Sequence, residues 1–285
     1  MPLKLVRHPI AEPISLAEAK LHLRVDITDD DTLISTMITA ARMHAEMLTH
    51  RAFVSQDWKY VLDSFPGPSQ MGIPWGKAFT LPGHAAFLEK SPVKYVSQIQ
   101  YLDMTGTQQV MPTTDYVIDY SSEPCRITPW FGKIWPIPLP QIGACEIDFT
   151  AGYVAPIVAN TVDSSITIQG AWESYAIGDV IRLSNVGGAL PTPLQPLTDY
   201  YIQSVPSAGK YTVAASFGGT LITLTDTGSG TSFIGEIPEG IRSWMKLRVG
   251  SLYQHREEYF TTEKAGKILP VPFVDRLLDP FIAPF

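Results

Sequence analysis

The chain has 285 residues, a formal net charge of −7 and 17% charged residues, which is typical of a globular protein of one or two domains. The acidic balance argues against a protein that binds DNA without sequence preference, because such binding needs basic patches. The first ten residues lack the apolar centre of a signal peptide, and no apolar run reaches the roughly 18 residues of a membrane span. We therefore expect a protein that is made and folded in a cytoplasm.

Two helices are predicted near the N-terminus. Ser15 and Glu18 have the spacing of a capping box, so a short helix is expected to begin there and end near Val25. Residues 29–53 predict a long helix. Its buried stripe is expected to comprise Leu33, Met37, Ala40, Ala41, His44 and Leu48, flanked by Ile34, Ile38, Ala45 and Met47. A third helix over Pro238–Glu258 has the same period and is the expected packing partner.

Beyond Phe53 the apolar residues alternate, which predicts strands. Asp103–Thr107 predicts a hairpin turn, and the proline-rich stretch Trp130–Pro140 predicts an irregular aromatic loop. The expected strands are Gln56–Leu62, Phe79–Leu81, Val96–Leu102, Tyr116–Tyr120 and Glu146–Thr150.

The two cysteines, Cys125 and Cys145, do not form a disulfide framework in a chain of this length. They could pair in an oxidising compartment, but buried free thiols are the favoured interpretation.

Residues 155–235 differ from the rest, with few charges and many Gly, Thr and Ser. Closely spaced short strands predict an inserted all-β sandwich or barrel. The domains expected are a core of residues 1–154 plus 236–267, the insertion 155–235, and a C-terminal tail, 268–285. The fold class is α+β: a small helical bundle with a β-layer, and the inserted β-domain. Strands of the insertion are expected at Ile166–Gln169, Val180–Leu183, Tyr200–Val205, Tyr211–Ala214 and Leu221–Thr225.

No motif indicates catalysis. The six histidines are scattered without metal-ligand spacing, and no phosphate-binding loop or nucleophile elbow is present. We therefore expect no enzyme, no cofactor and no metal site.

Two stretches instead indicate contacts with other chains. Trp130, Phe131 and Trp135 crowd one loop, which either anchors onto the β-layer or contacts a neighbouring subunit. The apolar, proline-broken tail either folds back on its own subunit or docks into a partner. Its candidate docking residues are Phe273, Leu277, Leu278, Phe281 and Phe285.

Several segments, in order, resemble the phage gp6-like head–tail connector (adaptor) proteins. They are EPISLAEAKLHLRVD and DDDTLISTMITAARMHAEMLTHRAF at the start, WFGKIWPIP and ACEIDFTAGY in the middle, and IPEGIRSWMKLRVGSLYQHRE and VDRLLDPF towards the end. Together they cover about residues 12–153 and 236–282. The compact members of the group lack the insertion. The ending of the last long helix matches at Tyr253 and Arg256, which join Trp130, Phe131 and Trp135 as candidate subunit-interface residues.

The resemblance implies a structural virion protein in the neck between capsid and tail. Such adaptors form a ring, commonly of twelve subunits, beneath the portal protein and join it to the tail or to a stopper protein. Genomic DNA passes through the lumen without sequence-specific binding, and no membrane is involved. The tail would reach the portal.

A second interpretation is a binding module of a tail, baseplate or capsid-decorating protein, in which the inserted β-domain binds carbohydrate. An exposed strip formed by Trp172, Tyr175, Tyr200, Tyr201 and Tyr211 would favour it.

Overall fold

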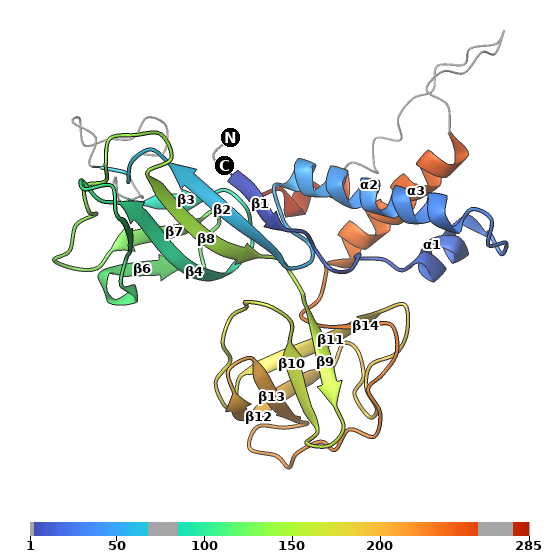
Figure 1. Ribbon diagram of the computed structural model, residues 1–285. Coiled ribbons are helices and arrows are strands. Elements are labelled where there is room, and N and C mark those ends of the chain that lie inside the picture. Colours follow the sequence, from blue (N-terminus) through green and yellow to red (C-terminus); the bar gives the residue numbers. More distant parts are fainter. Residues whose placement is uncertain (1–2, 68–84, 256–275, 285) are drawn as a thin grey trace, which may run out of the picture.

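The computed structural model describes residues 3–67, 85–255 and 276–284. Figure 1 shows three parts: a helical bundle, a β-layer beside it, and a separate barrel below the junction of the two. This arrangement confirms the predicted α+β class with an all-β domain. Among the described residues, no helix combines the length and apolar character needed to cross a membrane.

The bundle contains α1 (Leu16–Leu23), α2 (Asp31–Thr49) and α3 (Glu239–Gln254). The hydroxyl of Ser15 accepts a hydrogen bond from the backbone N–H of Glu18, as the capping spacing predicts. The three helices meet around a shared apolar core that includes Ile34, Ile38 and Trp244.

The predicted buried stripe of α2 is wrong by about one residue. The buried face contains Ile34, Ile38, Ala41, Arg42, Ala45, Glu46 and Thr49. Leu48 is instead exposed, and His44 is half-buried, with its ring edge-on to Trp244. Apolar residues occur on most sides of this helix, so their periodicity alone does not identify the buried side. That side also contains the ion pair between Arg42 and Glu46.

The β-layer consists of two sheets. The larger is antiparallel with strand order β1-β2-β8-β4-β5, and the smaller has order β3-β7-β6. Their facing side chains form a core that includes both free cysteines. The strands are β1 (Leu3–Arg7), β2 (Gln56–Leu62), β3 (Ala86–Leu88), β4 (Val93–Leu102), β5 (Gln108–Val110), β6 (Tyr116–Asp119), β7 (Cys125–Pro129) and β8 (Cys145–Ala151). Short 3-10 helices lie at Thr113–Asp115 and Asp279–Phe281.

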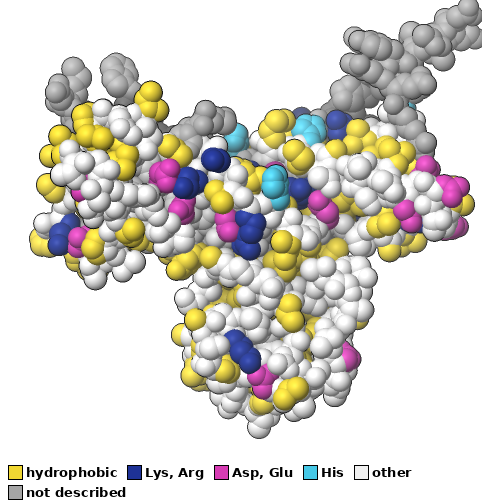
Figure 2. All heavy atoms as spheres, viewed as in Figure 1, with side chains coloured by type: hydrophobic (Ala, Val, Ile, Leu, Met, Phe, Trp, Pro, Cys, Tyr) yellow, Lys and Arg dark blue, Asp and Glu magenta, His cyan; other side chains and the backbone are white. Residues whose placement is uncertain are grey.

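The third part is a closed antiparallel barrel with strand order β10-β13-β12-β11-β14-β9. It has its own apolar core, centred on residues such as Ile166, Leu183 and Val213. On the face shown in Figure 2, the barrel carries few charged side chains compared with the core above it. The strands are β9 (Ala155–Asn160), β10 (Ser165–Ile168), β11 (Val180–Val186), β12 (Asp199–Ser207), β13 (Lys210–Ala214) and β14 (Thr231–Ile234).

Most predicted strands are present, but some predictions differ from the structure. Leu221–Thr225 forms only an isolated bridge from Leu221 to Ala214, so the strand predicted there is wrong. Phe79–Leu81 lies outside the described residues. Sequence patterns missed β1, β3, β7, β9 and β14.

A small apolar cluster of Val54, Val154 and Phe233 joins the barrel to the core. Lys94 on β4 adds an ion pair with Glu173, at 3.0 Å, and lies over the ring of Trp172. The barrel therefore contacts the core at more than its two chain connections.

Candidate functional site

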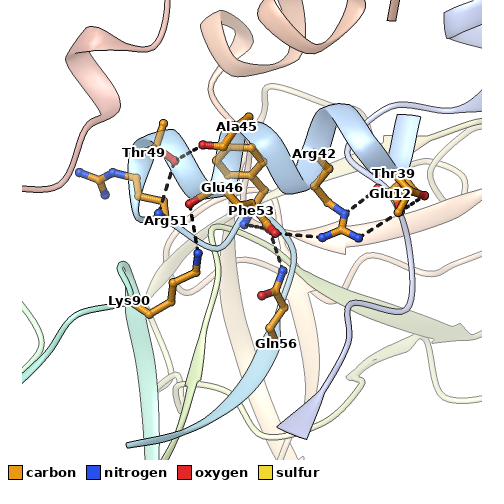
Figure 3. A network of polar contacts seen from close by, with 10 residues as sticks. All are labelled: Glu12, Thr39, Arg42, Ala45, Glu46, Thr49, Arg51, Phe53, Gln56 and Lys90. Carbon is orange, nitrogen blue, oxygen red and sulfur yellow. Dashed lines mark hydrogen bonds and ion pairs between the residues drawn. The ribbon is translucent and has the colours of Figure 1, made fainter. Parts of the chain in front are cut away.

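A buried polar network, shown in Figure 3, fixes α2 against the β-layer. Its centre is Glu46, whose Oε1 accepts hydrogen bonds from the backbone N–H of Phe53 at 3.0 Å and from Nε2 of Gln56 at 2.7 Å. Lys90, from the loop after β3, donates to the backbone oxygen of Glu46 at 3.2 Å. The network thus links the helix to the first residues of the sheet.

Arg42 extends this network to the N-terminal segment. Its guanidinium pairs with Glu46 at 2.9 Å and with Glu12 at 2.8 Å. Burial opposes the charge, but the hydrogen bonds and negative charges of Glu12 and Glu46 outweigh burial and raise the pKa of Arg42. These buried ion pairs fix the position of α2 relative to the N-terminal segment.

Arg51 holds the end of the chain. Its guanidinium makes two hydrogen bonds to the carboxylate of Glu123 and donates to the backbone oxygen of Phe281. The backbone N–H of Ala283 donates to Thr49 at 3.0 Å. Burial disfavours the charge of Arg51, but its bonds to Glu123 raise the pKa above its usual value. The last described residues are therefore anchored at the C-terminal end of α2.

The predicted docking residues of the tail fall into two groups. Leu277, Leu278 and Phe281 pack against the helical core of their own subunit, and Leu278 is only 2% exposed. Phe273 and Phe285 lie outside the described residues.

The predicted aromatic loop is irregular and strongly exposed. Trp135 anchors it: its ring stacks on Phe65 with centroids 4.6 Å apart. Trp130 is about half exposed and Phe131 is 98% exposed. A hollow of about 540 Å³ beside Trp135 is lined by Phe65, Ile134, Ile137 and the prolines of the loop. Sequence reasoning named the aromatic residues but missed Ile134, Ile137 and Ile142, which are also highly exposed.

Of the two candidate interface residues at the end of α3, the structure describes only Tyr253, which is partly buried. The hydroxyl of Tyr253 donates to the carboxylate of Asp30 within the same subunit. Arg256 lies outside the described residues.

The aromatic residues proposed for a carbohydrate surface do not lie together on the barrel exterior. Trp172, Tyr200 and Tyr211 are buried in the barrel, and Tyr175 packs against the same core. Tyr201 is half-buried beside Phe217. The exposed strip that the binding-module interpretation requires is therefore missing from these five positions. Within the described ranges, no group of three His, Cys, Asp or Glu side chains could hold a metal ion.

Comparison with known proteins identifies the sequence signature and the fold. Residues 13–71 match the family model of the phage gp6-like head–tail connector proteins. No curated protein matches the sequence.

Solved structures match over the whole chain. One is a chain in the virion of a native gene transfer agent particle, with 16% identity and a TM-score of 0.54. A second is a chain in the neck of the empty particle computed with C6 symmetry, with 17% identity and a TM-score of 0.54. A third is a chain in the neck of the native particle computed with C12 symmetry, with 16% identity and a TM-score of 0.53. Each alignment covers 100% of this chain and 97% of the other. At this identity the likeness shows a shared fold.

Proposed function

We propose that this chain, whose N-terminal residues carry the signature of the gp6-like connectors, is a structural virion protein of the neck between capsid and tail. Two findings together support this proposal most strongly. Residues 13–71 match the family model, and the full-length fold is similar to that of chains in the neck of a gene transfer agent particle. A structural role, without catalysis, also suits the buried ion pairs, which hold helices and strands together.

In this proposal the protein forms a homo-oligomeric ring, of twelve subunits, beneath the portal protein. Support comes from the C12 and C6 symmetries of the necks that contain chains of similar fold. A cyclic ring needs two different contact surfaces on each subunit. Exposed apolar side chains at the aromatic loop and on α2 offer two such surfaces.

The lumen of the ring would let genomic DNA pass without sequence-specific binding. The net charge of −7 supports this, because an acidic surface repels phosphates and keeps DNA from adhering. The opposite face of the ring would meet a tail-completion or stopper protein.

We assign portal docking to the tail, residues 268–285. Leu278 and Phe281 pack on the chain's own bundle, and Arg51 bonds to the backbone of Phe281, so the described part of this tail, residues 276–284, is fixed against the subunit. The side chains that we propose to enter the portal are Phe273 and Phe285, two large apolar residues of the tail, with Leu277 at the edge of the contact.

The test measures the mass of the purified protein, alone and mixed with the portal of the same particle. The full-length chain is expected to add a ring to the portal. Replacing both Phe273 and Phe285 with Ala is expected to abolish binding, and the unfolding midpoint of this variant is measured alongside its binding.

Leu278→Ala serves as the matched control, because it removes a buried contact and should lower stability by about 2 to 4 kcal/mol. If wild-type protein and portal remain separate at every concentration tried, the connector assignment fails. If the Phe double variant binds like the wild type, the assignment of docking to those residues fails.

A further inference from the structure

A cleft of about 540 Å³ lies between the barrel and the first turn of α3, and we call it the α3 cleft. Its lining is mainly apolar and ranges from Phe233, which is 1% exposed, to Leu197, which is 77% exposed. Such a lining suits an apolar segment of polypeptide. The apolar side chains that line it include Pro13, Val186, Pro196, Leu197, Phe233 and Pro238.

Two residues that line the α3 cleft each have a buried polar atom without a hydrogen-bond partner in the described part of the chain. They are Oε1 of Glu236, an acceptor, and Nε of Arg242, a donor. The Nη atoms of Arg242 are already bonded to Glu239 and Glu18. Unpaired buried polar atoms cost free energy, and an extended backbone offers N–H and C=O groups that can pair with them.

The charges around the α3 cleft favour an additional cation. Among the described residues, four carboxylates share three cations there, so one negative charge is left without a cation of its own. The pair between Glu236 and Arg182 is also long, at 3.7 Å. The ion pairs join Glu18, Asp199, Glu236 and Glu239 to Arg182, Arg242 and Lys246.

The chain's own C-terminal segment ends within reach of the α3 cleft. Residues 276–284 pack beside the first turn of α3, where a Cβ added to Gly240 would lie 3.4 Å from the backbone oxygen of Leu277. Glu239 and Arg242, which line the cleft, belong to the same turn. Eight extended residues before Leu277 span roughly 26 Å, which is more than enough to pass around this turn.

The sequence of residues 267–271, Lys-Ile-Leu-Pro-Val, matches the chemistry of the α3 cleft. Lys267 supplies a positive charge, and the residues after it are apolar. Leu269 and Val271 each precede a proline, which favours an extended backbone. An extended backbone makes no hydrogen bonds within itself, so its polar groups are available to Glu236 and Arg242.

We propose that residues 267–271 dock into the α3 cleft of their own subunit, with Lys267 facing the carboxylates of Glu236 and Glu239. A segment tethered so close has a high effective concentration at the cleft, which favours the chain's own subunit over a second copy. The contact itself does not depend on the connector role.

One consequence of the contact does rest on the proposed function. With residues 267–271 in the α3 cleft and residues 276–284 on the bundle, Phe273 lies on a short connection that is held at both ends. Such a connection loses little conformational freedom when it meets the portal, so the contact would pre-organise the docking residue.

Disulfide formation in the purified subunit, without portal, tests the contact. The double variant Leu197→Cys with Leu269→Cys is oxidised at low protein concentration, and peptide mapping under non-reducing conditions identifies the bridge. We expect a bridge within each chain. Leu197 is exposed, so its replacement should leave the fold intact. The native thiols, Cys125 and Cys145, are buried and should not contribute.

The matched control pairs Leu269→Cys with Val162→Cys. Val162 is 94% exposed on the turn after β9, a strand of six residues that leads away from the junction over roughly 20 Å (Figure 1). A segment that ranges over the surface meets both barrel positions at similar rates, whereas a docked segment meets only Leu197. The control bridge is therefore expected to form roughly tenfold more slowly.

Charge reversal gives a second readout in the Leu197–Leu269 double variant. Lys267→Glu brings like charges together at the α3 cleft and is expected to slow bridge formation roughly fivefold. Lys264→Glu is the matched control, because it makes the same change of charge outside the docked residues. Its rate should stay within about a factor of two of the parent rate.

The outcomes separate this contact from the connector role. A fast bridge to Leu197 that only Lys267→Glu slows supports the contact. Equal rates at Leu197 and Val162 overturn it, and so do bridges that form only between chains, which would assign the cleft to a second copy. Portal binding by the wild-type chain is measured separately, so either proposal can fail while the other stands.

Discussion

The guanidinium of Arg51 donates a hydrogen bond to the backbone oxygen of Phe281, although 230 residues separate them in the chain. The same group pairs with Glu123 of the β-layer and lies 5.7 Å from the centre of the Tyr153 ring, on the segment leading to the barrel. One side chain therefore joins the helical bundle, the small sheet and the end of the chain.

Replacing Arg51 with Met is expected to lower the free energy of unfolding by about 3 kcal/mol. The change leaves the Phe281 oxygen and the Glu123 carboxylate without their partner. Urea unfolding, followed by tryptophan fluorescence, measures the effect. Lys133→Met is the control: it breaks a more exposed ion pair with Asp115 and should cost at most about 1 kcal/mol. Equal effects in the two variants would contradict the role given to Arg51.

Glu18 makes the contact between α1 and α3 sensitive to acid. Burial raises its pKa, but hydrogen bonds from Lys246 and the charge of Arg242 outweigh burial, so the pKa lies below its usual 4.5. Because the pKa of Glu18 is lower in the folded than in the unfolded chain, its ionised carboxylate stabilises the fold. This stabilisation is fully present at a pH above the unfolded-state pKa, and it is lost as the pH falls through the folded-state pKa.

We therefore expect Glu18→Gln to reduce stability at neutral pH and to flatten the loss of stability below about pH 4.5. Unfolding in urea from about pH 7 to about pH 3 tests this. Lys246→Met should flatten the same region, because it removes the first partner that lowers the pKa. If the free energy of unfolding falls as steeply with acid in Glu18→Gln as in the wild type, Glu18 is not the source of the pH dependence.

The two thiols are expected to be unreactive in the folded protein. Burial raises the pKa of Cys125 to about 12 and that of Cys145 to about 11, and only the thiolate attacks thiol reagents. At about pH 8, labelling of the native chain should be slow and should reach two thiols per chain in denaturant. Fast labelling of the native protein would show that these residues are accessible.

Gly235 lies where β14 leaves the barrel, and it requires glycine. Its φ is +92°, and an added Cβ would lie 2.5 Å from the backbone oxygen of Tyr153. Gly235→Ala should cost about 1 kcal/mol of backbone strain and roughly 2 kcal/mol more for the clash. Gly209→Ala is matched, because its φ is +74° with nothing within 4 Å of the Cβ. Thermal unfolding should therefore show a clearly larger loss at position 235.

The sequence predicted elements more reliably than it predicted which side of an element is buried. Capping by Ser15 and the strand Gln56–Leu62 were both correct, because each depends on short-range pattern. The buried face of α2 was predicted wrongly, since it includes the charged residues Arg42 and Glu46. These two side chains can be buried only because Glu12 and Gln56 complete their hydrogen bonds. Those partners lie elsewhere in the chain, and periodicity cannot identify them.

The candidate contact surfaces were predicted in part. The crowding of Trp130, Phe131 and Trp135 indicated the loop, but not that Trp135 would turn inward onto Phe65 while Phe131 remained outside. Met47 was placed beside the buried stripe, and only the correct phase of the helix shows that it is exposed. Side-chain direction depends on tertiary packing, so sequence alone gave the segment and not its exposed members.

The pairing of β9 with β14 places the barrel's two ends next to each other, with Ala155 opposite Ile234. Adjacent antiparallel strands lie roughly 5 Å apart, a gap that a tight turn bridges. A short hairpin turn could therefore replace the whole barrel without changing the path of the rest of the chain. The domain can thus be gained, lost or exchanged at a single point of the fold, while the helices and sheets of the core keep their sequence.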